Sequence, residues 1–311
     1  MNSNPIEAEA RPRATRRTLA AALTGLGVVA LIGDRSERDS TGYGRVRDVP
    51  PPAAAAGFTN RVLFDDFDDL ATIDMNCTGK NGYIWYPSGV HLWNMSDTPR
   101  EAIEVRESVL TISPLTSNFN MQLATMDPNT RAGQTFGQGY FEARIKFPSG
   151  HAGVQGGGMS WPAFWSVSQS LFDNTVGGEG YAELDFFESG NPSDVFGGTV
   201  HVWRTPTVES HFRNPNVSTA TGSDFSQWQV VGCLWSAEKF SWYLNGVELR
   251  SVRRTVDGVL PEMVEDSTSN KRSDVSFGIF DLEAERRGMN VILGTGVGRP
   301  FSIDWVQLWT A

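Results

Sequence analysis

The sequence is poor in cysteine and in basic side chains. Its 311 residues include only two cysteines, Cys77 and Cys233. That number is too small for a disulfide scaffold or a cysteine-ligated zinc site, although one bridge between the two remains open. The net charge is −10, and residues 58–311 carry −12 because residues 1–57 hold eight arginines and six acids. This negative charge argues against nucleic acid, anionic membranes and heavily sulfated polysaccharides as partners.

Long apolar runs are missing too, apart from one near the N-terminus. Arg16 and Arg17 precede an apolar stretch from Leu19 to Ile32, which is shorter than the ~20 residues that span a bilayer. The pattern is typical of a bacterial twin-arginine export signal, and a membrane anchor is the alternative. We therefore expect an export signal over residues 1–33 and a periplasmic or extracellular protein. It would be membrane-anchored if the signal is not cleaved, and without stable membrane insertion if it is.

Helical periodicity is absent beyond this signal. Residues 34–57 are charged and then rich in proline and alanine, which predicts a linker. From residue 58 onward, short runs of β-forming residues alternate with Gly, Pro, Asn and Asp. This pattern predicts one all-β domain over residues 58–311, a sandwich or jelly roll of two antiparallel sheets. We expect a monomer.

The segment "YAELDFFESG" places three carboxylates within six positions, at Glu183, Asp185 and Glu188. Strand side chains alternate between faces, so Glu183 and Asp185 share a face while Glu188 has the wrong parity. One β-bulge near Phe186 and Phe187 would bring all three acids to one face. Carboxylates this close repel one another when all are ionised, so the pKa of at least one should rise. Retaining glycoside hydrolysis requires such a pair, with one carboxyl protonated and one ionised. An acidic, solvated edge strand is the alternative.

Several blocks, taken in order, resemble glycoside hydrolase family 16, the laminarinase, lichenase, agarase and carrageenase group. The resemblance implies a concanavalin-like β-jelly roll with a substrate cleft on its concave face. The bulged Glu-x-Asp-x-x-Glu signature is similar to that of the bacterial branches of the family. The blocks, which together cover about residues 60–311, are "LFDDFDD" (63–69), "GYFEARIKFPSG" (139–150), "WPAFW" (161–165), "ELDFFE" (183–188), "TVHVW" (199–203), "DFSQWQVVGCLWSAEKFSWYLNGVEL" (224–249) and "FSIDWVQLW" (301–309).

This resemblance implies a role for each acid. Glu183 would be the nucleophile, and Glu188 the general acid/base that protonates the leaving oxygen and then deprotonates the incoming water. Asp185 would lie between them, hydrogen-bond the nucleophile and tune both pKa values. Such a reaction requires no cofactor.

Further residues are candidate substrate contacts. Trp161 and Trp165 share one face of a predicted strand and would form an aromatic platform near the scission point, with core packing as the alternative. His201 follows the catalytic strand, where related enzymes often line the cleft with histidine; a purely structural histidine is the alternative. The remaining candidates, on neighbouring segments, are Trp203, Arg204, Trp93 and Asn94.

Two acids are candidate ligands of a structural calcium ion. Asp66 matches the acid of the family's opening strand, and Asp304 matches the usual ligand of its closing strand. Calcium needs several oxygen ligands, so two acids do not define a site, and a plain surface acid is the alternative for Asp304.

Three function classes follow. The leading hypothesis is an exported, retaining endo-β-glycosidase that hydrolyses a polysaccharide, β-1,3- or β-1,3/1,4-glucan, by double displacement. An agarase-like or exopolysaccharide-processing hydrolase or transglycosylase is one alternative. A non-catalytic carbohydrate-binding protein on the same fold is another, which the three acids disfavour because binding alone needs no paired nucleophile and acid.

Overall fold

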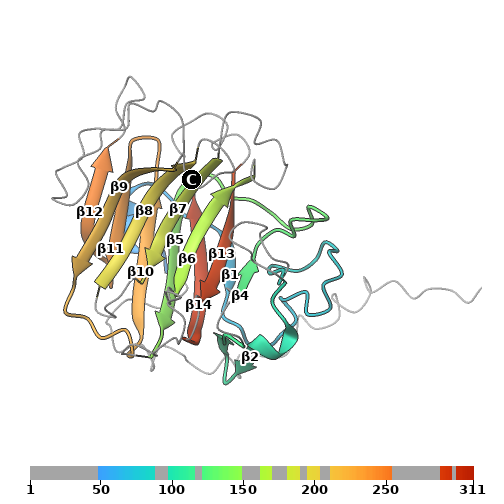
Figure 1. Cartoon of the computed structure of the whole chain (residues 1–311). Helices are drawn as coiled ribbons and strands as arrows, with labels where there is room; N and C mark the ends of the chain where they lie inside the picture. The colour runs from blue at the N-terminus through green and yellow to red at the C-terminus, as the bar shows by residue number, and fades with distance from the viewer. Residues whose placement is uncertain are drawn as a thin grey trace, which may run out of the picture. The chain divides into compact units, whose positions relative to one another are not determined.

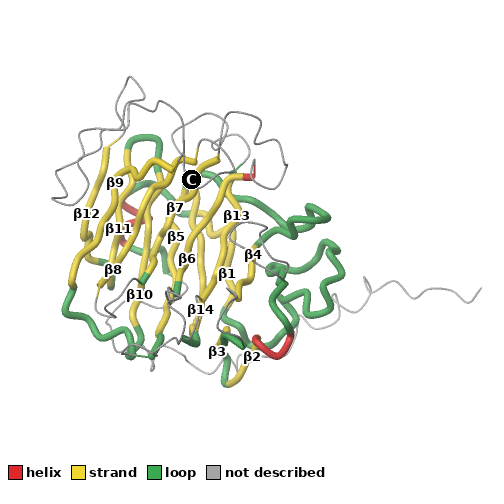
Figure 2. Tube along the Cα trace, in the orientation of Figure 1, coloured by secondary structure: helices red, strands yellow, loops and turns green. Residues whose placement is uncertain are grey.

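The computed structural model describes residues 48–87, 97–115, 121–148, 162–169, 181–189, 195–203, 211–253, 288–295 and 299–311. All of them lie in one folded unit, Arg47–Ala311. Strands make up nearly all of the regular structure (Figure 2), with two short helical segments, α1 (Pro51–Ala55) and η2 (Arg100–Ala102), named among the described residues. No helix in these ranges is long and apolar enough to cross a membrane.

One sheet has eight antiparallel strands in the order β12-β11-β10-β5-β14-β3-β2, with β1 also paired to β14. The hairpin between β11 and β12 turns at Asn245 and Gly246, which both have positive φ, as the Asn-Gly pair predicts. The strands of this sheet are β1 (Asn60–Asp65), β2 (Ile103–Arg106), β3 (Val109–Ile112), β5 (Gly139–Lys146), β10 (Gln229–Trp235), β11 (Lys239–Leu244), β12 (Val247–Arg253) and β14 (Phe301–Thr310).

The other sheet has six antiparallel strands in the order β4-β13-β6-β7-β8-β9. It stacks face to face on the first sheet, and its interior strand β7 packs across the core against β10 (Figure 1). The prediction of an all-β sandwich of two antiparallel sheets is therefore confirmed. The strands of this sheet are β4 (Met121–Ala124), β6 (Ala163–Ser168), β7 (Tyr181–Glu188), β8 (Val195–Trp203), β9 (His211–Ala220) and β13 (Met289–Thr295).

The main core fills the space between the two sheets. Every second residue of a strand points into it, so Phe141 and Cys233 lie in this core while their neighbours Tyr140 and Leu234 do not. The buried thiol of Cys233 and the exposed Cys77 are both free, which excludes the bridge that the sequence left open. The core-facing side chains of β7 are buried between the sheets, and its acids face away from this core.

The outer face of the eight-stranded sheet carries a second, smaller apolar cluster. Helix α1 lies over it, with Ala53 fully buried and Phe58 nearly so. The linker prediction for residues 34–57 is thus wrong from about residue 50 onward. The proline- and alanine-rich stretch folds because it covers aromatic side chains that would otherwise face water. The sheet residues of the cluster are Tyr140, Leu234, Tyr243 and Trp309.

Candidate active site

The bulge in β7 lies where the sequence predicts it. Across the β7–β8 ladder, Asp185 pairs with Thr199 and Glu188 pairs with Gly197, so three steps on β7 match two on β8. On the β6 side, Phe164 pairs with Phe187, and the next residue, Trp165, pairs with Asp185. Phe186 is therefore the extra residue of the bulge. The predicted bulge between Asp185 and Glu188 is confirmed.

The bulge brings the three acids to one face. In the β6–β7 register, Glu183 is opposite Val167, Asp185 is opposite Trp165, and Glu188 is opposite Ala163. These three β6 residues form a cluster separate from the inter-sheet core. Cross-strand partners share a face, so the acids lie on the sheet face that points away from the core.

Aromatic packing explains why β7 bulges here. Phe186 and Phe187 are consecutive, and yet both are fully buried in the inter-sheet core. The ring of Phe186 stacks on Phe141 with centroids 4.2 Å apart, and Phe187 packs 5.0 Å from Phe225. A regular strand would turn one of two consecutive side chains outward, so burying both requires an extra residue in the strand.

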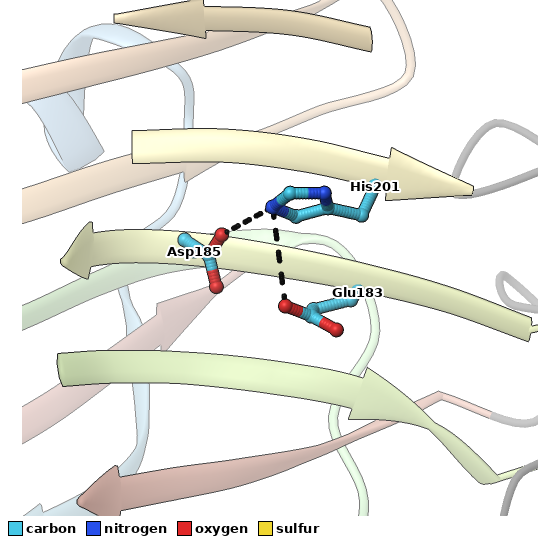
Figure 3. Close-up of side chains that lie close together, drawn as sticks. All are labelled: Glu183, Asp185 and His201. Atoms are coloured by element: carbon cyan, nitrogen blue, oxygen red, sulfur yellow. Dashed lines mark ion pairs between the residues drawn. The ribbon is translucent and has the colours of Figure 1, made fainter. Parts of the chain in front are cut away.

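His201 joins two of the acids (Figure 3). It lies opposite Glu183 in the β7–β8 register. Its Nε2 is 3.0 Å from Oδ2 of Asp185 and 3.9 Å from Oε1 of Glu183. Asp185 is 3% exposed, and burial raises the pKa of its carboxyl to about 8. This raised pKa favours the protonated carboxyl at neutral pH, and a neutral Asp185 adds no second negative charge beside Glu183.

The neighbours of Glu188 are small. Ala163 and Gly197 are its partners on the two adjacent strands, so the acid is flanked by little side-chain bulk. A Cβ atom at Gly197 would collide with the backbone carbonyl of Glu188. Sequence analysis missed Gly197, although a Gly-Gly pair in the middle of a β-run was the available signal.

The candidate substrate contacts have different outcomes. Trp165 lies on the acid-bearing face but is only 7% exposed, and it packs against Val167 and Ile292 as well as facing Asp185. His201 is brought into contact with the acids. Trp203 ends β8 opposite Tyr181, and its side chain is outside the described part of the structure. Also outside the described residues are Trp93, Asn94, Trp161 and Arg204.

The residues predicted for calcium do not fit that ion as a pair. Oδ2 of Asp304 accepts a hydrogen bond from Nη1 of Arg144 at 2.7 Å, and both side chains are buried. A guanidinium beside this carboxylate neutralises it and would repel a divalent cation. Asp304 is therefore a buried ion-pair partner, so the surface-acid alternative is wrong.

A different set of side chains has the ligand spacing of a metal site. Glu183, Asp185 and His201 each offer one ligand atom, and these atoms lie within 4.8 Å of one another. Within the described ranges this is the only group of three or more His, Cys, Asp or Glu residues with that property. The imidazole of His201 is also within hydrogen-bonding distance of Asp185 and close to Glu183. The same geometry therefore suits a proton shared between these side chains as well as it suits a metal ion.

No protein-family model matches the chain. Over 176 residues, 54% of this chain, it is 28% identical to the endo-1,3-1,4-beta-glycanase EglC of Rhizobium meliloti (strain 1021). The matched region is 33% of EglC, so the chain spans about one third of the length of this curated relative.

Solved laminarinase structures have the same fold. The laminarinase of Flavobacterium sp. UMI-01 superposes with a TM-score of 0.54 at 15% identity, covering 81% of this chain and 100% of that one. The laminarinase catalytic domain of Thermotoga maritima MSB8 gives 0.53 at 17% identity, covering 81% and 98%. SCLam, a non-specific endo-β-1,3(4)-glucanase from family 16, gives 0.50 at 15% identity, covering 85% and 97%. The chain thus has the jelly-roll fold of the family 16 enzymes, as the sequence blocks indicate.

Proposed function

We propose that this protein is a retaining endo-β-glycosidase that hydrolyses β-1,3- or mixed β-1,3/1,4-glucan. The observation that carries the proposal is the bulge of β7, which brings Glu183, Asp185 and Glu188 to one face with His201 in contact. The named activity of EglC and of the laminarinases of the same fold supports the glucan assignment. A non-catalytic binding protein would have no need of three carboxyl groups placed on one face of a single strand.

The proposed reaction has two steps. Glu183 attacks the anomeric carbon while Glu188 protonates the leaving oxygen, which leaves a glycosyl-enzyme ester. Glu188 then removes a proton from water, and this water displaces Glu183 from the sugar. Asp185 stays neutral because burial raises its pKa to about 8. A neutral Asp185 leaves Glu183 as the ionised member of the adjacent pair, which is the state that a nucleophile requires.

The charge of the chain favours a neutral polysaccharide. With a net charge of −10 on the whole chain, a sulfated galactan would meet long-range repulsion, whereas a glucan would not. This favours glucan over carrageenan within the range of substrates that the fold accepts. We further propose that the protein acts outside the cytoplasm as a monomer, exported by the signal over residues 1–33, which lies outside the described residues.

A substrate panel tests the proposal. The purified protein is incubated with laminarin, lichenan, agarose and carrageenan, and the products are sized and their anomeric configuration is followed by NMR. We expect internal cleavage of laminarin or lichenan with β-anomers released first. Cleavage of agarose or carrageenan alone would overturn the glucan assignment, first release of α-anomers would overturn the retaining mechanism, and binding without cleavage would overturn the enzyme assignment. N-terminal sequencing of the exported protein tests the signal.

A further inference from the structure

We propose that Trp242, in the sheet behind the active site, is a positioning residue for the catalytic carboxylates. Trp242 lies in β11 and is fully buried in the inter-sheet core. Its indole Nε1–H crosses the core and donates a hydrogen bond of 2.9 Å to the backbone carbonyl of Asp185. The two residues belong to different sheets, so this bond ties the catalytic strand to the sheet beneath it.

The hydrogen bond from Trp242 reaches β7 at its bulge. The regular pairing of β7 with β8 breaks directly after Asp185 and resumes at Glu188. A backbone carbonyl at such a break depends on a donor from outside the ladder, since a buried acceptor without a partner is costly. Trp242 supplies that donor from the core side.

Holding this carbonyl sets the acids on the opposite face. The carbonyl of Asp185 points into the core, while its carboxyl lies on the other side of the strand, 3.0 Å from His201. Fixing the carbonyl therefore fixes the rotation of the peptide that follows Asp185. That peptide begins the bulge, which determines how Glu188 is placed relative to Glu183. Retaining chemistry depends on this separation, because the two carboxyls must stay about 5–5.5 Å apart.

The core contains a matched control for the hydrogen bond. Trp235 is also fully buried in the inter-sheet core, but its indole nitrogen has no hydrogen-bond partner. Trp235→Phe and Trp242→Phe thus make the same change in volume at the same burial. Only the second substitution removes a bond to the catalytic strand.

The experiment compares the two variants on the glucan that the wild type cleaves, and so rests on the proposed function. We expect Trp242→Phe to lower kcat by about 10- to 100-fold with KM changed less than about threefold, because the acids are misplaced while the binding surface remains. Its alkaline pH–rate limb should also move, since Asp185 titrates in an altered position. Trp235→Phe should keep the wild-type pH profile and a kcat within about threefold.

A second variant separates the hydrogen bond from packing. In Trp242→His, the ring Nε2–H can occupy the place of the indole N–H, while the benzene ring is lost. We expect this variant to unfold at a lower temperature than Trp242→Phe and yet to retain a higher kcat. If kcat instead follows thermal stability across the three variants, or if Trp242→Phe matches Trp235→Phe, the positioning role is overturned. A wild type without activity on any glycan would instead overturn the proposed function.

Discussion

At the scale of single residues, the roles of Glu183 and Glu188 can be separated by chemical rescue. Each change to alanine should lower turnover of polysaccharide by about 10⁴-fold or more, because nucleophile and acid/base act as a unit. On an aryl β-glycoside whose leaving group needs no protonation, azide should rescue Glu188→Ala with a β-glycosyl azide, since azide replaces the water that Glu188 activates. Azide should rescue Glu183→Ala with the α product, because it attacks the opposite face directly. NMR of the products measures the configuration.

The control for this rescue is Glu248→Ala. Glu248 is a carboxylate on β12 whose Oε2 is 3.4 Å from Nζ of Lys239, away from the acid-bearing sheet. This variant should turn over polysaccharide as the wild type does and should form no glycosyl azide beyond the wild-type level. Equal product configurations from Glu183→Ala and Glu188→Ala would contradict the assigned roles.

Asp185 makes both activity and stability depend on pH. Its pKa rises from an ordinary 3.8 to about 8 because it is buried. Between about pH 4 and pH 8, the folded protein keeps this proton bound and the unfolded chain has released it. The contribution of Asp185 to the free energy of unfolding therefore falls as the pH rises through this range, and it is constant above about pH 8. Activity should decline above pH 8, when Asp185 ionises beside Glu183.

Asp185→Asn tests this dependence. The amide cannot ionise, so the free energy of unfolding should vary less between pH 4 and 8 than in the wild type. The decline of kcat above about pH 8 should also move or disappear, although kcat itself is expected to be lower. Denaturant unfolding and pH–rate profiles measure the two effects. An unchanged alkaline limb in Asp185→Asn would show that another group governs it.

Zinc should inhibit the enzyme reversibly. His201 Nε2 is 3.0 Å from Asp185 Oδ2 and 3.9 Å from Glu183 Oε1. In a tetrahedral zinc site with bonds of about 2.0 Å, ligand atoms are roughly 3.3 Å apart. Small shifts of the side chains would therefore give these three atoms the spacing of zinc ligands. We expect micromolar Zn²⁺ to block turnover, EDTA to restore it, and Ca²⁺ or Mg²⁺ to have no effect, because they prefer oxygen ligands. Calorimetric titration of His201→Gln should show weaker zinc binding than His211→Gln, and equal binding would contradict this site.

At the scale of elements, the bulge depends on a glycine in the next strand. A Cβ at Gly197 would collide with the carbonyl of Glu188, and backbone cannot move aside as a flexible side chain can. Gly197→Ala should therefore displace Glu188, lower kcat by about 10-fold or more and destabilise the fold by about 1–3 kcal/mol. Kinetics and thermal unfolding measure both effects.

Gly137→Ala is the matched control for this change. Gly137 lies before β5, and a Cβ there would meet no atom within 4 Å. Its substitution should leave kcat and stability near their wild-type values. A Gly197→Ala variant as active and stable as Gly137→Ala would show that the bulge tolerates a side chain at Gly197.

At the scale of the whole molecule, helix α1 should contribute to stability but not to catalysis. Ala53 and Phe58 cover aromatic residues on the outer face of the eight-stranded sheet, and the acids are on the outer face of the other sheet. A chain that begins at Thr59 should lose about 2–3 kcal/mol of stability, as expected for exposing one large buried side chain and its neighbours. At a temperature where it is folded, its kcat should match that of a chain beginning at Asp48. A large loss of kcat there would contradict this separation.

How much of the site could be predicted from the sequence depends on the range of the interaction. The two-residue period of a strand, together with the spacing of Glu183, Asp185 and Glu188, was enough to predict a bulge and a shared face, since both are local properties of one strand. The all-β fold followed from many short β-runs and from the order of the blocks. These are patterns along the chain, and no distant contact is needed to read them.

Tertiary structure alone decided which distant groups meet those acids. The contact of His201 with Asp185 depends on the register between β7 and β8, and the bond from Trp242 depends on the stacking of one sheet on the other. Asp304 pairs with Arg144 across two strands, and the proline- and alanine-rich segment forms a helix that covers the outer face of the eight-stranded sheet. Each outcome depends on which groups lie opposite one another in the folded protein. A buried polar group is costly unless it is hydrogen-bonded or paired with an opposite charge, and an apolar surface is stabilised when another apolar group covers it.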